Sequence, residues 1–306
     1  MHTIPQPQPD ARPDERLRLS PLVLGLWRAG RVQLPRPRLV ELIAASLDVG
    51  IDTFDLADIY GNYAGEQAFG DALAASRVPR DRVRLVSKGG VCLVSDARPA
   101  HRVKHYDNGA AHLRASLDAS LQKLRTDHLD LFLVHRPDFL FDADELADTL
   151  RQMVRAGKAR HVGVSNFSPS QQRLLAARLP ELAANQIELS VLRRAPFEDG
   201  TLDLCQEQHC IPMAWSPLGG GALFTADAPD MQRLRTALAE VGEALGSATP
   251  DQVALAWLMR HPSGVIPVLG TTDPARVRIA AGAADLRLDR QQWYHIWQAA
   301  TGCAVA

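Results

Sequence analysis

Four polar residues that could move a proton lie where apolar segments of this chain end. The segment GIDTFDL carries Asp55 near its end, and Tyr60 follows one turn later. Two later apolar segments end on Lys88 and His135. A carboxylate in a buried strand is costly unless a partner compensates it, so Asp55 is expected to have one. These four side chains are the first candidates for a functional site.

A tyrosine beside an ammonium and a carboxylate is suited to donating a proton. The phenol has a pKa of about 10 in water and is a weak acid at neutral pH. A neighbouring Lys88 ammonium lowers that pKa, and Asp55 holds the ammonium charged and oriented. His135 can hydrogen-bond and orient a substrate oxygen. Together the four residues could protonate a carbonyl oxygen that gains negative charge.

The elements that would position these residues alternate between strand and helix. Several of eight short apolar runs are continuous, as expected for parallel strands covered on both faces. The runs are residues 22–26, 50–56, 82–88, 129–135, 161–166, 185–190, 211–216 and 265–270. Eight strands with about eight helices in 306 residues predict a single-domain α/β fold, a (β/α)₈ TIM barrel. We expect a flexible, disordered tail over 1–17, a barrel domain over 18–306 and an extra C-terminal helix.

The helical segments carry periodicity and start signals. Leucines recur on one face of residues 112–124. A capping side chain precedes a proline in three places, at Ser168, Thr249 and Asp273. Asp142 and Glu145 have the spacing of a capping box.

A doubly wound parallel sheet is the competing architecture. It would normally bring a glycine-rich phosphate turn after the first strand, and WRAG stands there instead. In a barrel, the carboxyl ends of the strands converge, so the four polar residues would share one pocket. The longest irregular stretches, 89–108 and 217–229, both follow strands and belong to the same face.

Composition and net charge limit the classes of binding partner that this chain is expected to have. The net charge of −1 favours neither nucleic acid nor an anionic membrane, and no 18-residue apolar run is present. The cysteines form no disulfide framework or zinc pattern, which favours packing roles and a reduced, cytoplasmic protein. His101, His105 and His112 invite a metal hypothesis, but the paired histidines of a metal-dependent barrel hydrolase are absent from the first strand. We expect no metal site.

The motifs, taken in order, resemble the aldo-keto reductase superfamily from about residue 18 to 300. They include GIDTFDLADIYG, LVSKGG, DLFLVHRPD, GKARHVGVSNFSP, MAWSPLGGG and VIPVLGTTDPARVR. The nearest subgroup is that of YdhF-like bacterial predicted oxidoreductases. This resemblance implies that Tyr60 is the general acid, that Asp55 and Lys88 tune it, and that His135 positions the carbonyl. It also implies a nicotinamide cofactor across the barrel mouth.

The resemblance further assigns residues to that cofactor. The implied set is Gly25, Trp27, Asp55, Ser165, Asn166, Gln186, Trp215, Ser216, Leu218, Gly219, Gly270, Thr271, Thr272 and Arg276. The last four could bind a 2′-phosphate, which favours NADPH over NADH. Gly270 stands where some relatives have a phosphate-binding lysine, and Ala280 where some have an adenine-contacting asparagine.

Two functions follow from these observations. The first is an NADPH-dependent oxidoreductase that reduces a small aldehyde or ketone to an alcohol, active as a monomer. The second is a non-catalytic, NADPH-binding regulatory subunit on the same fold. Short-chain dehydrogenase chemistry would need a YxxxK helix, and alanine stands four residues after both Tyr60 and Tyr106. The loops that set specificity leave the substrate open.

Overall fold

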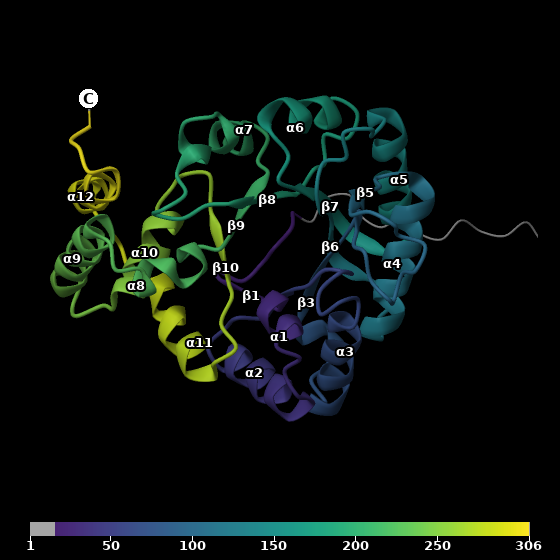
Figure 1. Ribbon diagram of the computed structural model, residues 1–306, viewed down its shortest axis with the longest axis horizontal. Coiled ribbons are helices and arrows are strands. Elements are labelled where there is room, and N and C mark those ends of the chain that lie inside the picture. The colour runs from purple at the N-terminus through teal and green to yellow at the C-terminus, as the bar shows by residue number, and fades with distance from the viewer. Residues whose placement is uncertain (1–15, 306) are drawn as a thin grey trace, which may run out of the picture.

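The computed structural model describes residues 16–305, so the predicted tail lies outside the described residues except for Arg16 and Leu17. Eight parallel strands close into a barrel in the order β1, β2, β3, β6, β7, β8, β9 and β10 (Figure 1). They are β1 (Val23–Gly25), β2 (Thr53–Asp55), β3 (Arg84–Gly89), β6 (Leu129–Val134), β7 (Ala159–Ser165), β8 (Ala184–Glu188), β9 (Ile211–Trp215) and β10 (Ile266–Leu269). The predicted (β/α)₈ barrel is confirmed.

Helices surround the strands, as Figure 1 shows. They are α1 (Trp27–Arg31), α2 (Arg36–Asp48), α3 (Gly65–Ser76), α4 (Ala110–Leu124), α5 (Ala143–Arg155), α6 (Pro169–Ala176), α7 (Thr201–Glu207), α8 (Ala222–Thr225), α9 (Pro229–Ala244), α10 (Pro250–Met259), α11 (Pro274–Ala281) and α12 (Arg290–Thr301). The 3₁₀ turns are η1 (Arg80–Arg82), η2 (Ala195–Phe197), η3 (Gly219–Gly221) and η4 (Gly282–Asp285).

The strands are buried on both faces, which explains their continuous apolar runs. One face fills the barrel interior with a cluster that includes Val23, Val86 and Met213. The other face packs against the helices through a larger cluster that includes Leu85 and Phe132. Most strand residues on both faces are apolar, although Ser87, Asp130 and Asn185 are buried polar residues within strands. The polar side chains that gather where the strands end are the candidates for a functional role.

The predicted caps are present, with one correction. The Ser168 side chain accepts a hydrogen bond from the Gln171 N–H, and Asp273 accepts one from the Ala275 N–H. Asp142 likewise accepts from the N–H of Glu145 at 3.0 Å. The Glu145 side chain does not return this bond, because it accepts from the N–H of Ala110 instead. Asp142 is therefore a helix cap without a reciprocal box.

The two stretches predicted to be irregular contain short elements. Within 89–108, β4 (Val91–Cys92) pairs antiparallel with β5 (His105–Tyr106). Within 217–229 lie η3 and α8. Two-residue strands and a four-residue helix are too short to leave a periodic pattern, which is why the sequence did not indicate them. Both stretches follow barrel strands, as expected.

The extra C-terminal helix is α12, which lies beside α9 at the edge of the molecule in Figure 1. Its Trp293 stacks on Trp257 of α10, with ring centroids 4.7 Å apart. Each indole N–H donates to the other residue's backbone carbonyl, at 3.0 and 3.1 Å. Trp293 and Trp297 therefore pack against the barrel wall, whereas Tyr294 is 39% exposed. No helix within residues 16–305 has the length and apolar character needed to cross a membrane.

Candidate active site

The barrel brings Asp55, Lys88 and Tyr60 into direct contact. The Lys88 ammonium donates to Asp55 Oδ2 at 2.8 Å, to the Leu56 carbonyl at 2.7 Å and to Tyr60 Oη at 3.2 Å. β2 and β3 are neighbouring parallel strands, so their ends deliver the carboxylate and the ammonium side by side. Asp55 is paired, as the sequence predicted.

The ion pair lies beneath the surface, whereas Tyr60 reaches the opening. Lys88 and Asp55 are 0% and 2% exposed, and Tyr60 is only partly buried. The second carboxylate oxygen of Asp55 accepts from the Gln186 side-chain amide at 2.9 Å. A buried ion pair is stable only when its remaining hydrogen-bonding atoms are satisfied. Gln186 thus completes the pair from the opposite side of the barrel.

His135 stands beside Tyr60 at the end of β6. The two ring centroids are 6.0 Å apart, with the rings edge to face. The His135 backbone N–H donates to the Gly89 carbonyl, which ties it to β3. Its Nδ1 is buried and has no hydrogen-bond partner among the described residues. The four predicted residues therefore meet at one place.

The protonation states follow from burial and from neighbouring charges. Burial raises the pKa of Tyr60 above its usual 10.0, and the opposing effect of Lys88 is smaller. Lys88 does lower the pKa of Tyr60 as expected, but burial has the larger effect and the net pKa is raised. Burial opposes the charge of Lys88, yet Asp55 and Tyr60 raise the pKa of the ammonium above 10.5. Burial and then Lys88 hold the pKa of His135 well below 6.5. At neutral pH the phenol carries its proton and the imidazole is neutral.

A second polar group lies at the ends of β7, β8 and β9. Asn166 adopts a left-handed backbone with φ of 62°, and its Nδ2 donates to Ser165 Oγ at 2.7 Å. The Trp215 indole donates to Asn166 Oδ1 at 3.0 Å. Ser165 Oγ and the Asn166 N–H both donate to the Gln186 carbonyl at 2.9 Å. This network joins the predicted carboxamide-binding residues to the residue that holds Asp55.

Two arginines lie at the barrel opening. Arg136, which follows His135, forms no ion pair within the described residues. Its guanidinium instead lies over the Trp215 ring, 5.7 Å from the centroid. Arg28 of α1 hydrogen-bonds the Gly220 carbonyl in the loop after β9. Trp27 is 49% exposed beside it.

The remaining cofactor candidates follow β1, β9 and β10. Gly25 is a close-approach position, because a Cβ there would meet Val268 Cγ1 at 2.9 Å. Ser216, Leu218 and Gly219 begin the loop after β9, and Gly270, Thr271 and Thr272 the loop after β10. Arg276 is exposed on the first turns of α11, and it has no ion pair or hydrogen bond within residues 16–305. Gly25 is paired with Asp55 in the register of β1 and β2, and the other residues of this set lie in the loops after β9 and β10 and on α11.

A buried polar cluster beside the site was not predicted. Asp58 lies in the turn between β2 and α3, is only 7% exposed and accepts from Ser116 Oγ at 2.7 Å. Glu66 is fully buried and accepts from Ser87 Oγ at 2.6 Å. Burial raises the pKa of Asp58 to about 7. The sequence did not predict that Asp58 and Glu66 are buried, because neither the segment LADIYG nor the start of α3 shows which side chains face the protein interior.

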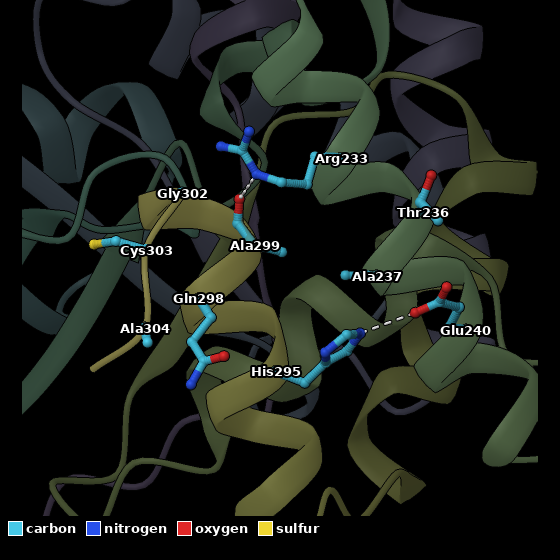
Figure 2. A pocket seen from close by; sticks show the side chains of 10 residues that line it. All are labelled: Arg233, Thr236, Ala237, Glu240, His295, Gln298, Ala299, Gly302, Cys303 and Ala304. Atoms are coloured by element: carbon cyan, nitrogen blue, oxygen red, sulfur yellow. Dashed lines mark hydrogen bonds and ion pairs between the residues drawn. The ribbon is translucent and has the colours of Figure 1, made fainter. Parts of the chain in front are cut away.

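One cavity lies away from the strand ends, between α9 and α12 (Figure 2). It has a volume of about 470 Å³. His295 faces Glu240 at 2.9 Å, and Arg233 Nε donates to the Ala299 carbonyl at 2.9 Å. Cys303 beside it is exposed, whereas the other three cysteines are buried and free. Residues 16–305 contain no set of three or more metal-ligating side chains placed to hold an ion.

Comparisons with known proteins agree with this geometry. Residues 21–300 match the model of the aldo/keto reductase family. The chain is 45% identical to the uncharacterized oxidoreductase YcsN of Bacillus subtilis, over 94% of this chain and 96% of YcsN. It is 45% identical to the oxidoreductase YdhF of Escherichia coli, over 94% of this chain and 95% of YdhF.

Two further proteins carry more specific descriptions. The chain is 42% identical to a 6-dehydroglucose reductase of Agrobacterium fabrum, over 95% of this chain and 98% of the relative. It resembles the crystal structure of an aldo/keto reductase from Klebsiella pneumoniae in complex with NADP and acetate. The TM-score is 0.74 and the identity 28%, over 91% of this chain and 90% of that one.

Proposed function

The chain belongs to the aldo/keto reductase family, and from that membership we propose that it is an NADPH-dependent carbonyl reductase. It would reduce an aldehyde or ketone to an alcohol, with Tyr60 as the proton donor. The observation that carries this proposal is the contact of Tyr60 Oη with the buried Lys88 ammonium at 3.2 Å. A phenol in that position is both protonated at rest and stabilised when it loses its proton.

Each residue of the group has a distinct role in this proposal. Tyr60 donates its proton to the carbonyl oxygen as negative charge develops there. Lys88 stabilises the phenolate that remains, and Asp55 keeps the ammonium oriented toward it through the 2.8 Å contact. His135, neutral at physiological pH, hydrogen-bonds the same oxygen and fixes the carbonyl beside Tyr60. The group works without any charged residue other than the Lys88–Asp55 pair.

The residues around the opening fit a nicotinamide dinucleotide phosphate. Thr271 and Thr272 precede the eight-residue helix α11, and Arg276 offers a guanidinium without a partner in the described chain. Hydroxyls, backbone N–H groups and a guanidinium form a donor set suited to a phosphate. Ser165, Asn166 and Gln186 would hold the carboxamide, and Trp215 would stack on the ring. When bound, the reduced cofactor supplies the hydride.

The test is NADPH consumption with a panel of aldehydes and ketones, for wild type and Tyr60→Phe. The variant keeps the ring and loses only the hydroxyl, so we expect kcat to fall about 100-fold or more. NADPH affinity, measured by fluorescence titration, should change little because Tyr60 is not among the phosphate-binding residues. Tight NADPH binding without turnover of any substrate in wild type would contradict the proposal and favour a regulatory subunit.

The proposed setting is a reduced cytoplasm and the proposed active form is a monomer. The four cysteines are free, which suits a reducing compartment. All four proposed catalytic residues come from one chain, so a single copy can assemble the site. Light scattering of the purified protein, with and without NADPH, tests the monomer.

A further inference from the structure

Arg136 is an arginine at the mouth of the site without a charged partner. We propose that it anchors a carboxylate on the substrate, so that the preferred substrates are aldehydes or ketones that also carry a carboxylate. This inference rests on the proposed carbonyl reduction and adds the substrate class. It does not depend on which carbon skeleton joins the two groups.

The position of Arg136 follows from the strand ends. It comes directly after His135, which ends the interior-facing row of β6. From there its guanidinium crosses to Trp215 at the end of β9, 5.7 Å from the ring centroid. Asn166 lies between these two strands, where it donates to the His135 carbonyl and accepts from the Trp215 indole. The side chain is thus laid over the opening next to the proposed carbonyl site.

The guanidinium has no acceptor of its own. Within residues 16–305 it makes no ion pair and donates no hydrogen bond, although it is partly buried. The acidic residue nearest in sequence, Asp138, accepts from the backbone N–H of Leu140 at 2.9 Å and of Asn108 at 3.3 Å. A partly buried guanidinium with five N–H donors and no acceptor can bind a carboxylate through two parallel hydrogen bonds.

The charge around His135 points the same way. Besides burial, the groups that lower its pKa are Lys88, Arg136 and Lys104. Asp55 neutralises Lys88 through the buried ion pair, whereas Lys104 is exposed and forms no ion pair in the described chain. The charged groups that act on His135, apart from the Lys88–Asp55 pair, are therefore the cations Arg136 and Lys104. An anionic group on the substrate would be attracted to them.

Formylbenzoates and their methyl esters test the inference, because each pair differs in the charge of the second group and otherwise only by one methyl group. The ortho, meta and para isomers place the carboxylate at different distances from the aldehyde. We expect kcat/KM for at least one acid to exceed that of its ester by roughly 10- to 100-fold. The ester is the more electrophilic aldehyde, so intrinsic reactivity opposes the expected preference.

Three variants identify the source of the preference. Arg136→Gln should bring the acid-to-ester ratio close to one, and Arg136→Lys should leave an intermediate ratio because it keeps charge without the planar fork. Arg160→Gln is the matched control, since Arg160 is an exposed arginine at the start of β7, the opposite end from the site. It should keep the wild-type ratio. An equal loss for acid and ester in Arg136→Gln would assign a structural role and overturn the inference.

Binding separates this inference from the proposed reaction. The product alcohols, the hydroxymethylbenzoates and their methyl esters, cannot be reduced and can be titrated calorimetrically into the NADPH-loaded protein. Tighter binding of the acid in wild type but not in Arg136→Gln supports the anchor, even if no aldehyde is turned over. Turnover of both acid and ester with no preference in kcat/KM or binding overturns the anchor and leaves the reductase. Glyceraldehyde carries hydroxyl groups and no carboxylate. If Arg136→Gln lowers kcat/KM equally for glyceraldehyde and for the formylbenzoates, Arg136 recognises hydroxyl groups and the carboxylate anchor is overturned.

Discussion

At the scale of single residues, the proposed proton donor, Tyr60, is reached from Gln186 by a chain of contacts. The Gln186 amide donates a hydrogen bond to one carboxylate oxygen of Asp55, and the Lys88 ammonium donates to the other. The same ammonium also donates to Tyr60 Oη. Only Tyr60 of these is open to a substrate. The tuning of the acid is therefore set by atoms that no substrate touches, which makes them testable apart from substrate binding.

Replacing Gln186 by Met should weaken both stability and catalysis. The change leaves a buried carboxylate oxygen without a donor, which costs about 1–3 kcal/mol of unfolding free energy. We also expect kcat to fall, because Asp55 becomes free to turn from Lys88. The measurements are denaturant unfolding and steady-state kinetics on the same preparation.

Asn185 offers the matched control for Gln186. It is a buried amide on the same strand, but it donates to the Phe167 carbonyl at 3.0 Å and to Gln172 at 2.8 Å, away from the site. Asn185→Ala should lower stability by a similar amount and leave kcat unchanged. Equal effects of the two substitutions on kcat would show that Gln186 acts only through the fold.

Asp58 should make stability depend on pH. Its pKa is about 7 in the folded protein, compared with 3.8 for an ordinary aspartate, because burial disfavours its charge. The folded state therefore binds the proton more tightly than the unfolded state. Its contribution to the unfolding free energy is full below about pH 4 and is lost as pH rises toward 7, by up to ~1.4 kcal/mol per pH unit.

The substitution Asp58→Asn isolates this effect. The variant should gain stability relative to wild type between pH 4 and pH 7, and the difference should be constant above about pH 8. Asp118→Asn, in an exposed pair with Lys158, controls for the change in net charge. Urea unfolding across this pH range measures it, and parallel curves for wild type and Asp58→Asn would refute the assignment.

The four central residues could be predicted from the sequence, because few residues of their types stand at the ends of apolar segments. The chain has lysine only at 88, 104, 123 and 158, so a lysine at the end of an apolar strand was informative. The net direction of the Tyr60 pKa was not predictable, since it depends on how much burial outweighs Lys88. The sequence also could not show that the Arg136 guanidinium lacks an ion-pair partner, because this depends on how the side chains pack in the folded protein.

At the scale of elements, the strand ends carry the proposed catalytic residues, and the loops after them are proposed to recognise cofactor and substrate. Apolar runs located all eight barrel strands, because burial on both faces leaves a continuous signal. The β4–β5 hairpin and the turns after β9 were missed, since each is only two to four residues long. The ends of the strands could be predicted from the sequence, but the structure of the loops that follow them could not.

The first turns of α11 should discriminate NADPH from NADH. Arg276→Ala removes the unpaired guanidinium there, and we expect the Kd for NADPH to rise about 10-fold or more while that for NADH changes little. Arg278→Ala is the control, because Arg278 lies two residues on and faces Asp48 at 3.7 Å. Fluorescence titration with both dinucleotides measures it. Equal weakening of both cofactors would contradict a phosphate role for Arg276.

At the scale of the whole molecule, the chemistry and the stability lie in different parts. The proposed catalytic group is built from the ends of β2, β3 and β6, whereas α12 packs outside the barrel against α9 and α10. The Trp293–Trp257 stack joins α12 to α10 there. Damage to this stack should thus affect folding and spare the site.

Trp293→Ala tests that separation. The change removes a stacked ring and the hydrogen bond that the Trp293 indole donates to the Trp257 carbonyl, while the bond to the backbone carbonyl of residue 293 can persist. We expect a loss of about 3 kcal/mol of unfolding free energy. Tyr294→Ala, at a neighbouring residue that is 39% exposed, should cost less than about 1 kcal/mol. Denaturant unfolding gives both values, and kinetics corrected for the folded fraction should give the wild-type kcat for both variants. A lowered kcat in folded Trp293→Ala would mean that the barrel wall transmits strain to the strand ends, and the proposed division would be wrong.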